Sequence, residues 1–312
     1  MGTPEFAVPC LDILLKNNYN VVAVVTAPDK PAGRGQELKE SAVKKFAIEK
    51  GIKILQPEKL KDEKFIEELK GLKADLQIVV AFRMLPEVVW NMPLLGTYNL
   101  HASLLPKYRG AAPINWAIIN GETETGVTTF KLQQQIDTGN ILFQEKVKIN
   151  ETTTAGELHN ELMRVGAELI LKSVKVIESK NYELKQQDDS LIVHAPKIFK
   201  ETCKIDWRKS CDEIYNLIRG LSPYPGAYTE FNDAPIAIGG NLQTLKIFSS
   251  VKEKVNHKAT NGLLTTDGKT FLKAACADGF INLKELQLQG KKRMSVEEFL
   301  RGYKFLDNCS FV

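Results

Sequence analysis

Hydrophobic residues in the first half of the chain alternate between short continuous runs and stretches with helical spacing. The continuous runs are rich in β-branched residues, as is typical of strands buried on both faces, and they cover residues 21–26, 53–55, 76–81 and 97–100. Helical stretches separate them, at residues 5–16, 41–50 and 62–72. Strands that alternate with helices predict an α/β fold with a Rossmann-like, doubly wound and mostly parallel sheet.

The second half of the chain has a different pattern, in which short strands predominate. Two strands are expected at residues 127–132 and 141–147, before a long amphipathic helix over 154–179. Beyond a polar stretch and one helix, short strand-like runs separated by Gly and Asn turns cover residues 245–248, 261–266, 270–274 and 280–288. We therefore expect an α/β domain over residues 1–183, a linker over 184–204 and a small OB-like β-barrel over 205–312.

The composition is that of a globular protein with two domains. The chain has 312 residues, of which 43% are hydrophobic and 26% charged, and no apolar run reaches the roughly 18 residues of a membrane span. The N-terminus lacks the basic and apolar segments of a secretory signal, so we expect a cytoplasmic protein with no membrane partner. Five scattered cysteines without a C-x-x-C pair indicate free thiols, and the scattered histidines indicate no metal site.

Basic residues are concentrated in the C-terminal third. The formal net charge is +4, and residues 196–312 carry 18 lysines and arginines against 13 acidic residues, whereas the rest of the chain is nearly neutral. A basic domain favours a polyanionic partner, such as a nucleic acid.

The most informative stretch for chemistry lies between residues 97 and 113. It begins with a predicted strand in which Asn99 and His101 point to the same side, at the carboxyl end where open parallel sheets bind ligands. The amide can donate a hydrogen bond to a developing oxyanion, and the imidazole can move protons near neutral pH. The apolar, rigid segment Ser103-Leu104-Leu105-Pro106 follows, and it is suited to walling a flat apolar ligand.

Asp137 is the next polar candidate. It lies in a Gln-Ile-Asp-Thr-Gly turn after an apolar strand, where its carboxylate could orient the His101 imidazole and stabilise its charge. The residues alone leave open the alternative that Asp-Thr-Gly is an ordinary hairpin turn and that His101 is structural.

The motifs around these residues carry a resemblance to a known family. Asn99 and His101 stand in the pattern N-x-H-x-S-L-L-P, and Asp137 in a downstream D-x-G. This set resembles the formyltransferases that depend on 10-formyltetrahydrofolate. Three further segments, GTPEFA at 2–7, PDKPAGRG at 28–35 and RGAAP at 109–113, are similar to the members of this family that act on initiator methionyl-tRNA.

The resemblance implies a reaction and a role for each side chain. The formyl group of 10-formyltetrahydrofolate would pass to the amino group of methionine on initiator tRNA, without a metal ion. Asn99 would help to hold the formyl oxygen, His101 would stabilise the oxyanion and relay protons, and Asp137 would fix His101 and could accept the amine proton. How His101 and Asp137 divide the proton transfers stays open.

The resemblance also implies a folate pocket. Its wall would consist of two segments, Ser103, Leu104, Leu105 and Pro106 in the first and Phe82, Arg83, Met84 and Leu85 in the second. This chain has Ala-Phe-Arg where many relatives have Ala-Tyr-Gly before Leu-Pro. The details of pterin contact are therefore expected to differ.

Two basic regions are expected to contact tRNA. By charge alone the loop over residues 27–39 is a solvated surface loop, but the resemblance implies that it reaches the acceptor end through Lys30 and Arg34. In the C-terminal domain the tRNA would be clamped by Lys246, Lys291, Lys292 and Arg293. We expect the protein to act as a monomer.

The chain departs from the family at its start. Relatives have a β-strand before the Gly-Thr-Pro-Glu-Phe-Ala segment, whereas here only Met1 precedes Gly2. That strand would lie inside the sheet, so its absence is expected to leave two strand edges unpaired. Either the start codon is misplaced, which we favour because exposed strand edges are costly, or the chain tolerates the missing strand.

Two other functions stay open. Formyltransferases that act on amino-sugar nucleotides share the N-L-H-x-S-L-L-P-K-Y-R-G pattern and a C-terminal barrel, although they lack the P-A-G-R-G loop. A non-catalytic folate- or RNA-binding protein could keep the same scaffold. Replacing His101 by alanine identifies the latter, because a binding protein would keep its affinity and function.

Overall fold

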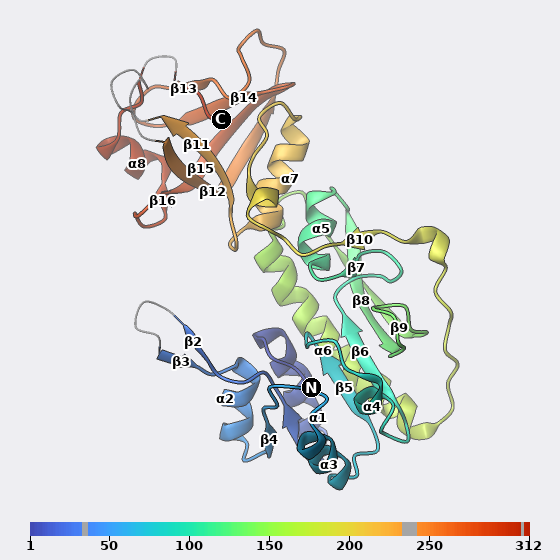
Figure 1. Ribbon diagram of the computed structural model, residues 1–312. Coiled ribbons are helices and arrows are strands. Elements are labelled where there is room, and N and C mark those ends of the chain that lie inside the picture. Colours follow the sequence, from blue (N-terminus) through green and yellow to red (C-terminus); the bar gives the residue numbers. More distant parts are fainter. Residues whose placement is uncertain (33–36, 233–241, 307–308) are drawn as a thin grey trace. The chain divides into compact units, whose positions relative to one another are not determined.

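The computed structural model describes residues 1–32, 37–232, 242–306 and 309–312, which form two compact units (Figure 1). The first unit consists of Met1–Pro113, Glu124–Lys148 and His159–Pro196. The second consists of Ile114–Thr123, Ile149–Leu158 and Lys197–Val312, so it includes two segments from the N-terminal half. Within the described ranges, no helix is long and apolar enough to cross a membrane.

A four-stranded sheet forms the middle of the first unit. Its strands lie in the order β5 (Gln77–Val80), β6 (Thr97–His101), β8 (Glu124–Lys131) and β9 (Ile141–Lys148). β5 and β6 are parallel, and the other neighbours are antiparallel. A separate parallel pair joins β1 (Val24–Val25) to β4 (Ile54–Leu55). The predicted α/β class with parallel strands is confirmed, although part of the sheet is antiparallel.

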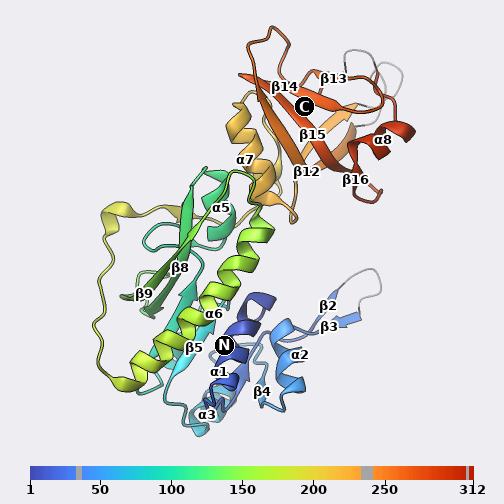
Figure 2. The ribbon, with the colours of Figure 1, turned by 180° about the vertical axis from the view of Figure 1, so that it is seen from behind.

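The main helices of the first unit begin and end close to the predicted residues. They are α1 (Val8–Lys16), which continues a 3-10 turn η1 (Glu5–Ala7), α2 (Ala42–Glu49), α3 (Glu63–Gly71) and most of α6 (Ala155–Ser179). Ser41 and Asp62 cap α2 and α3, because each side chain accepts a hydrogen bond from a backbone N–H of the first turn. α6 lies along the four-stranded sheet (Figure 2), and its Ser173 hydroxyl bonds that of Thr129 on β8 at 2.8 Å.

Several short elements of the first unit are not predicted by the hydrophobic pattern. They are the antiparallel hairpin of β2 (Lys30–Ala32) and β3 (Glu37–Lys39), the helix α4 (Glu87–Trp90), the 3-10 turn η2 (Asp189–Leu191), and the strands β7 (Arg109–Gly110) and β10 (His194–Ala195). β7 and β10 pair in parallel. This pairing ties the stretch predicted as a linker to the first unit.

Met1 and Gly2 lie between the edges of β1 and β5. The Gly2 N–H donates to Val25 O at 3.0 Å, and the Met1 ammonium group donates to Ile78 O at 2.6 Å. Burial lowers the pKa of this ammonium group to about 6. A cavity of about 490 Å³ lies between the two edges. Gly2 forms an isolated parallel bridge with Val80 of β5, and among the described strands β1 pairs with β4 and β5 with β6.

A curled antiparallel sheet makes up most of the second unit (Figure 1). Its strands lie in the order β11 (Ala227–Asn232), β12 (Leu242–Lys254), β15 (Gly279–Leu288), β14 (Leu272–Cys276) and β13 (Leu264–Thr266), and β16 (Met294–Ser295) pairs with β15. β12 to β15 overlap the four predicted strand-like runs. The unit also contains η3 (Glu201–Cys203), most of α5 (Pro113–Ile119), α7 (Cys211–Leu221) and α8 (Val296–Gly302). α7 begins with a capping box and buries Ile214 and Ile218 in the core of this unit.

Candidate active site

β6 carries two of the predicted catalytic side chains. The sheet register pairs Asn99 with Val79 on β5 and with Phe130 on β8, and His101 follows two positions later on the same side of β6. His101 is 7% exposed, and its Nε2 donates a hydrogen bond to Tyr108 O at 2.8 Å, since a carbonyl oxygen can only accept. In the neutral ring, Nδ1 therefore holds the lone pair that can take up a proton.

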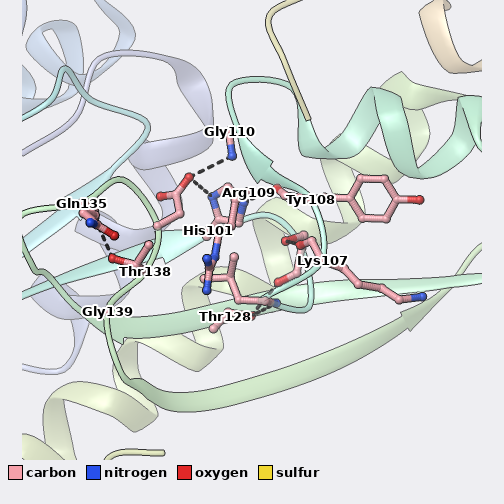
Figure 3. Close-up of polar contacts among 12 residues, drawn as sticks. His101, Lys107, Tyr108, Arg109, Gly110, Thr128, Gln135, Thr138 and Gly139 are labelled. Carbon is pink, nitrogen blue, oxygen red and sulfur yellow. Dashed lines mark hydrogen bonds and ion pairs between the residues drawn. The ribbon is translucent and has the colours of Figure 1, made fainter. Parts of the chain in front are cut away.

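Asp137 lies opposite His101, on the loop between β8 and β9. Its Oδ2 lies 3.8 Å from His101 Nδ1 and accepts a hydrogen bond from the Gly110 N–H at 3.0 Å; His101 and Gly110 are labelled in Figure 3. Asp137 has a φ of +55°, in the left-handed region, which costs a residue with a side chain about 1 kcal/mol. Gly139 is required in the same loop, because a Cβ there would lie 1.8 Å from Lys131 O. The fold thus brings the predicted His–Asp pair together.

The geometry of this pair suits proton transfer. A separation of 3.8 Å between His101 Nδ1 and Asp137 Oδ2 is too long for a direct hydrogen bond, so an amine placed between them could contact both acceptors. No described residue hydrogen-bonds the Asn99 side-chain amide, which leaves its N–H groups for a substrate oxygen. Together the three side chains offer one oxyanion donor and two proton acceptors.

The predicted folate wall after β6 is held by one buried hydroxyl. Thr128 Oγ1 donates to Ser103 O at 2.6 Å and accepts from the Leu105 N–H at 3.1 Å. Gln144 Nε2 donates to the same hydroxyl oxygen at 3.0 Å and to Leu105 O at 2.9 Å. Leu104 is half-buried, and the other three predicted residues, Ser103, Leu105 and Pro106, are buried. Leu104 is therefore the member of this segment with side-chain surface left for a ligand.

The other predicted folate segment lies between β5 and α4. Arg83 donates to the backbone oxygens of residues 57–58 at 2.7 and 2.9 Å, and its guanidinium carbon lies 5.4 Å from the centre of the Phe82 ring. Leu85 is buried in the core of the first unit, whereas Met84 is 72% exposed. Arg83 thus fixes this segment to the neighbouring loop, and Phe82 and Met84 keep apolar surface exposed.

In the first unit, the predicted tRNA contacts belong to the β2–β3 hairpin. Lys30 is exposed at the start of β2, directly opposite Lys39 on β3. Arg34 lies outside the described residues. Two lysines across one hairpin suit contact with phosphate groups.

In the second unit, some of the predicted tRNA contacts already bond other groups of the protein, and others do not. Lys246 on β12 is half-buried and donates to Pro225 O at 2.8 Å. Lys291, Lys292 and Arg293 are exposed between β15 and β16. Arg293 forms an ion pair with Glu285, whereas neither lysine is paired with an acidic side chain within the described part of the chain. Of these four predicted contacts, Lys291 and Lys292 are therefore the ones whose charges are most available to a polyanion.

Sequence reasoning misses the side chains that hold the site in place. Arg109 and Gln187 are both buried, and Gln187 Oε1 accepts hydrogen bonds from Arg109 Nε and Nη2 at 3.0 and 2.7 Å. Arg109 belongs to the R-G-A-A-P motif, which is a signal that could have identified it. Gln187 lies in the polar stretch predicted as a linker, where no local pattern distinguishes it from Gln186.

The five cysteines are not among the residues of the candidate active site. All five are free thiols, as expected. Among the described residues, Cys211, Cys276 and Asp278 of the second unit form a group that could hold a metal ion, with the two sulfur atoms 3.2 Å apart. Burial raises the pKa of both thiols, which disfavours the thiolate forms that bind metals.

Comparison with known proteins gives a consistent result. The family model described as formyl transferase matches residues 1–174, and that for the formyl transferase C-terminal domain matches residues 197–304. The chain is 53% identical over 311 residues to the methionyl-tRNA formyltransferase of Bacteroides thetaiotaomicron, with 98% of this chain and 95% of that protein covered. It is 54% identical over 310 residues to the methionyl-tRNA formyltransferase of Flavobacterium johnsoniae, with 99% and 96% covered. Among solved structures, the N-formyltransferase of Helicobacter canadensis, in complex with folinic acid and dTDP-3-aminofucose, has a TM-score of 0.65 at 22% identity and covers 94% of this chain and 97% of its own.

Proposed function

Because the chain belongs to the formyl transferase family, we propose that it transfers the formyl group of 10-formyltetrahydrofolate to the free amino group of methionine on initiator methionyl-tRNA. The observation that carries this proposal is the His101–Asp137 pair, which lies on the same side of β6 as an Asn99 amide that no described residue hydrogen-bonds. Relatives named for this activity match nearly the whole chain, which supports the choice of acceptor.

The proposed reaction is an acyl transfer between two nitrogen atoms. The methionine nitrogen attacks the formyl carbon, so that a C–N bond forms, and the C–N bond to the folate then breaks. The attacking amine must lose a proton, the leaving nitrogen must gain one, and negative charge develops on the formyl oxygen in between. Asn99 donates a hydrogen bond to that oxygen, and Asp137 Oδ2 and His101 Nδ1 accept the amine proton and return it to the leaving nitrogen.

We propose the carboxyl ends of β5 and β6 as the folate site. Parallel neighbours present their following loops at one edge of a sheet, and here those loops are the segments 82–85 and 103–106. Phe82, Met84 and Leu104 supply partly exposed apolar surface, which suits a flat ring system. The residues present therefore fit a folate-derived formyl donor.

We propose that residues 1–183 form a Rossmann-like transfer domain and residues 205–312 an OB-like barrel that binds tRNA, joined through 184–204. The excess of basic residues in the C-terminal third supports a polyanion partner there. In the barrel, the proposed phosphate contacts are Lys291, Lys292, Arg293 and Lys246. Lys246 also donates a hydrogen bond to the backbone at Pro225. Lys30 and Arg34 are the proposed contacts to the acceptor end of the tRNA.

A comparison of acceptors tests the proposed function. Purified protein is incubated with labelled 10-formyltetrahydrofolate and either initiator methionyl-tRNA or a dTDP-linked amino sugar. The proposal predicts labelled formylmethionyl-tRNA and no labelled sugar. Label on the sugar would identify an amino-sugar nucleotide formyltransferase instead. Binding of tRNA and folate without transfer, unchanged in a His101→Ala variant, would identify a binding protein.

A further inference from the structure

We propose that Gln187 is a positioning residue for formyl transfer, because its side-chain amide fixes the loop that carries Asp137. The inference rests on the role proposed above for Asp137. It concerns a residue of the 184–204 stretch, which the sequence indicates only as a connection between domains. In the structure this stretch forms part of the first unit as far as Pro196.

The chain around Gln187 is attached on both sides of the Asp137 loop. Lys185 exchanges two backbone hydrogen bonds with Ile141 at the start of β9, at 2.7 and 2.8 Å. Further along, β10 pairs with β7, so that the Ala111 N–H donates to Ala195 O at 2.8 Å. The segment between these anchors therefore passes along the loop with Gln187 directed at it.

The Gln187 amide forms four hydrogen bonds. It is 7% exposed, and its Nε2 donates to Asp137 O at 2.9 Å and to Gly139 O at 2.7 Å. Its Oε1 accepts both bonds from Arg109, at 3.0 and 2.7 Å. Two carbonyl groups on one side and a guanidinium on the other permit only this orientation of the amide. Both donors and both acceptor positions of Gln187 are thus in use.

Arg109 closes a ring of contacts through the next residue of the chain. Gly110 follows Arg109 directly, and its N–H donates to Asp137 Oδ2 at 3.0 Å. Arg109 is 8% exposed, and its Nη2 also bonds the exposed Asp189 carboxylate at 2.8 Å. Gln187 therefore holds the backbone of Asp137 directly. It also bonds Arg109, and the next residue, Gly110, holds the Asp137 carboxylate.

The Asp137 loop depends on such outside support. The four residues before Asp137, 133–136, are exposed, and even Ile136 has 61% of its surface accessible, so apolar packing does not anchor that side of the loop. Asp137 itself adopts the left-handed φ of +55°, a conformation that persists only where neighbouring contacts impose it. Displacement of a reacting group by about 1 Å can lower a rate by about 100-fold.

The experiment compares Gln187→Ala and Gln187→Glu with matched changes at Gln186, an exposed glutamine one position earlier. In Gln187→Glu the carboxylate can still accept from Arg109 but cannot donate to the carbonyl groups of Asp137 and Gly139. We expect both Gln187 variants to lower kcat for formyl transfer about 10- to 100-fold, with KM for tRNA within about threefold of the unaltered protein. We expect Gln186→Ala and Gln186→Glu to have no effect.

A double variant shows whether Gln187 acts through Asp137. If it does, Gln187→Ala has no further effect on kcat in an Asp137→Asn background. Full activity of Gln187→Glu would overturn the inference, because it would show that Gln187 serves only Arg109. If Gln187→Ala lowered kcat by the same factor in the unaltered protein and in the Asp137→Asn variant, that result would overturn the inference too.

If Gln187→Ala does not fold, the comparison of kcat between Gln187→Glu and Gln186→Glu decides. Full activity of Asp137→Asn would instead refute the proposed role of Asp137, which separates the two failures.

Discussion

The Thr128 hydroxyl offers a quantitative test of how the site is held together. It is fully buried on β8, donates to Ser103 O, and accepts from the Leu105 N–H and from Gln144 Nε2. Thr128→Val keeps the shape of the side chain and removes all three hydrogen bonds. Gln144 keeps its bond to Leu105 O, so the principal losses are one buried carbonyl and one buried N–H without a partner. At about 1–3 kcal/mol for each of these two groups, we expect a loss of about 2–6 kcal/mol in the free energy of unfolding.

Thr125 provides a matched control on the same strand. It is 3% exposed, and its hydroxyl has no hydrogen-bond partner within the described residues. Thr125→Val therefore removes a buried polar group that gains nothing from the fold, and we expect a change between zero and about 1 kcal/mol of stabilisation. Urea denaturation of both variants, followed by circular dichroism, measures the difference. A stability of Thr128→Val within about 1 kcal/mol of that of Thr125→Val would refute the reasoning that this hydroxyl holds the 103–106 segment.

Three further predictions concern the loop, the thiols and the basic surface. Gly139→Ala places a Cβ 1.8 Å from Lys131 O, so we expect kcat to fall about 100-fold in a formyl-transfer assay, whereas Gly71→Ala, whose Cβ meets nothing within 4 Å, keeps full activity. Burial raises the pKa of the Cys10 thiol to about 12, and it raises the pKa values of the other four thiols as well. We therefore expect a thiol reagent at about pH 8 to label at most the half-buried Cys309 in the native protein, and all five cysteines in denaturant. Alanine at Lys291 or Lys292 is expected to reduce the slope of log affinity for tRNA against log salt concentration by about 1 each, whereas alanine at Lys16, which is paired with Asp12, leaves the slope unchanged.

The main elements of the fold are predictable because they follow from local patterns. β-branched runs identify β1 and β5, and capping residues identify α2 and α3, because each run or cap consists of residues close together in the chain. The β2–β3 hairpin is not predictable in the same way, because Pro31 and the nearby glycines have the composition of a loop. β7 and β10 are two residues long, too short to show any period, and they form only because distant segments meet.

In the candidate site, too, local patterns predict some residues, and contacts between distant segments determine the others. Alternation along one strand is enough to place Asn99 and His101 on one side of β6. The approach of Asp137 to His101 depends on how the β8–β9 loop folds back over β6, so the residues alone leave it open beside an ordinary hairpin turn, and the resemblance to a family favours it. Thr128, Gln144 and Gln187 act through contacts with distant backbone groups, and such contacts leave no mark in local composition.

Single-turnover formylation of initiator methionyl-tRNA tests the central claim, that His101 and Asp137 move the proton during formyl transfer. The unaltered protein and the His101→Ala and Asp137→Asn variants are each mixed in excess with labelled folate donor and tRNA, after tRNA binding has been shown to be equal. We expect either substitution to slow the transfer step by about 10²- to 10⁴-fold, which is the usual contribution of a general acid–base group. A transfer rate for Asp137→Asn within about threefold of the unaltered protein would contradict the account.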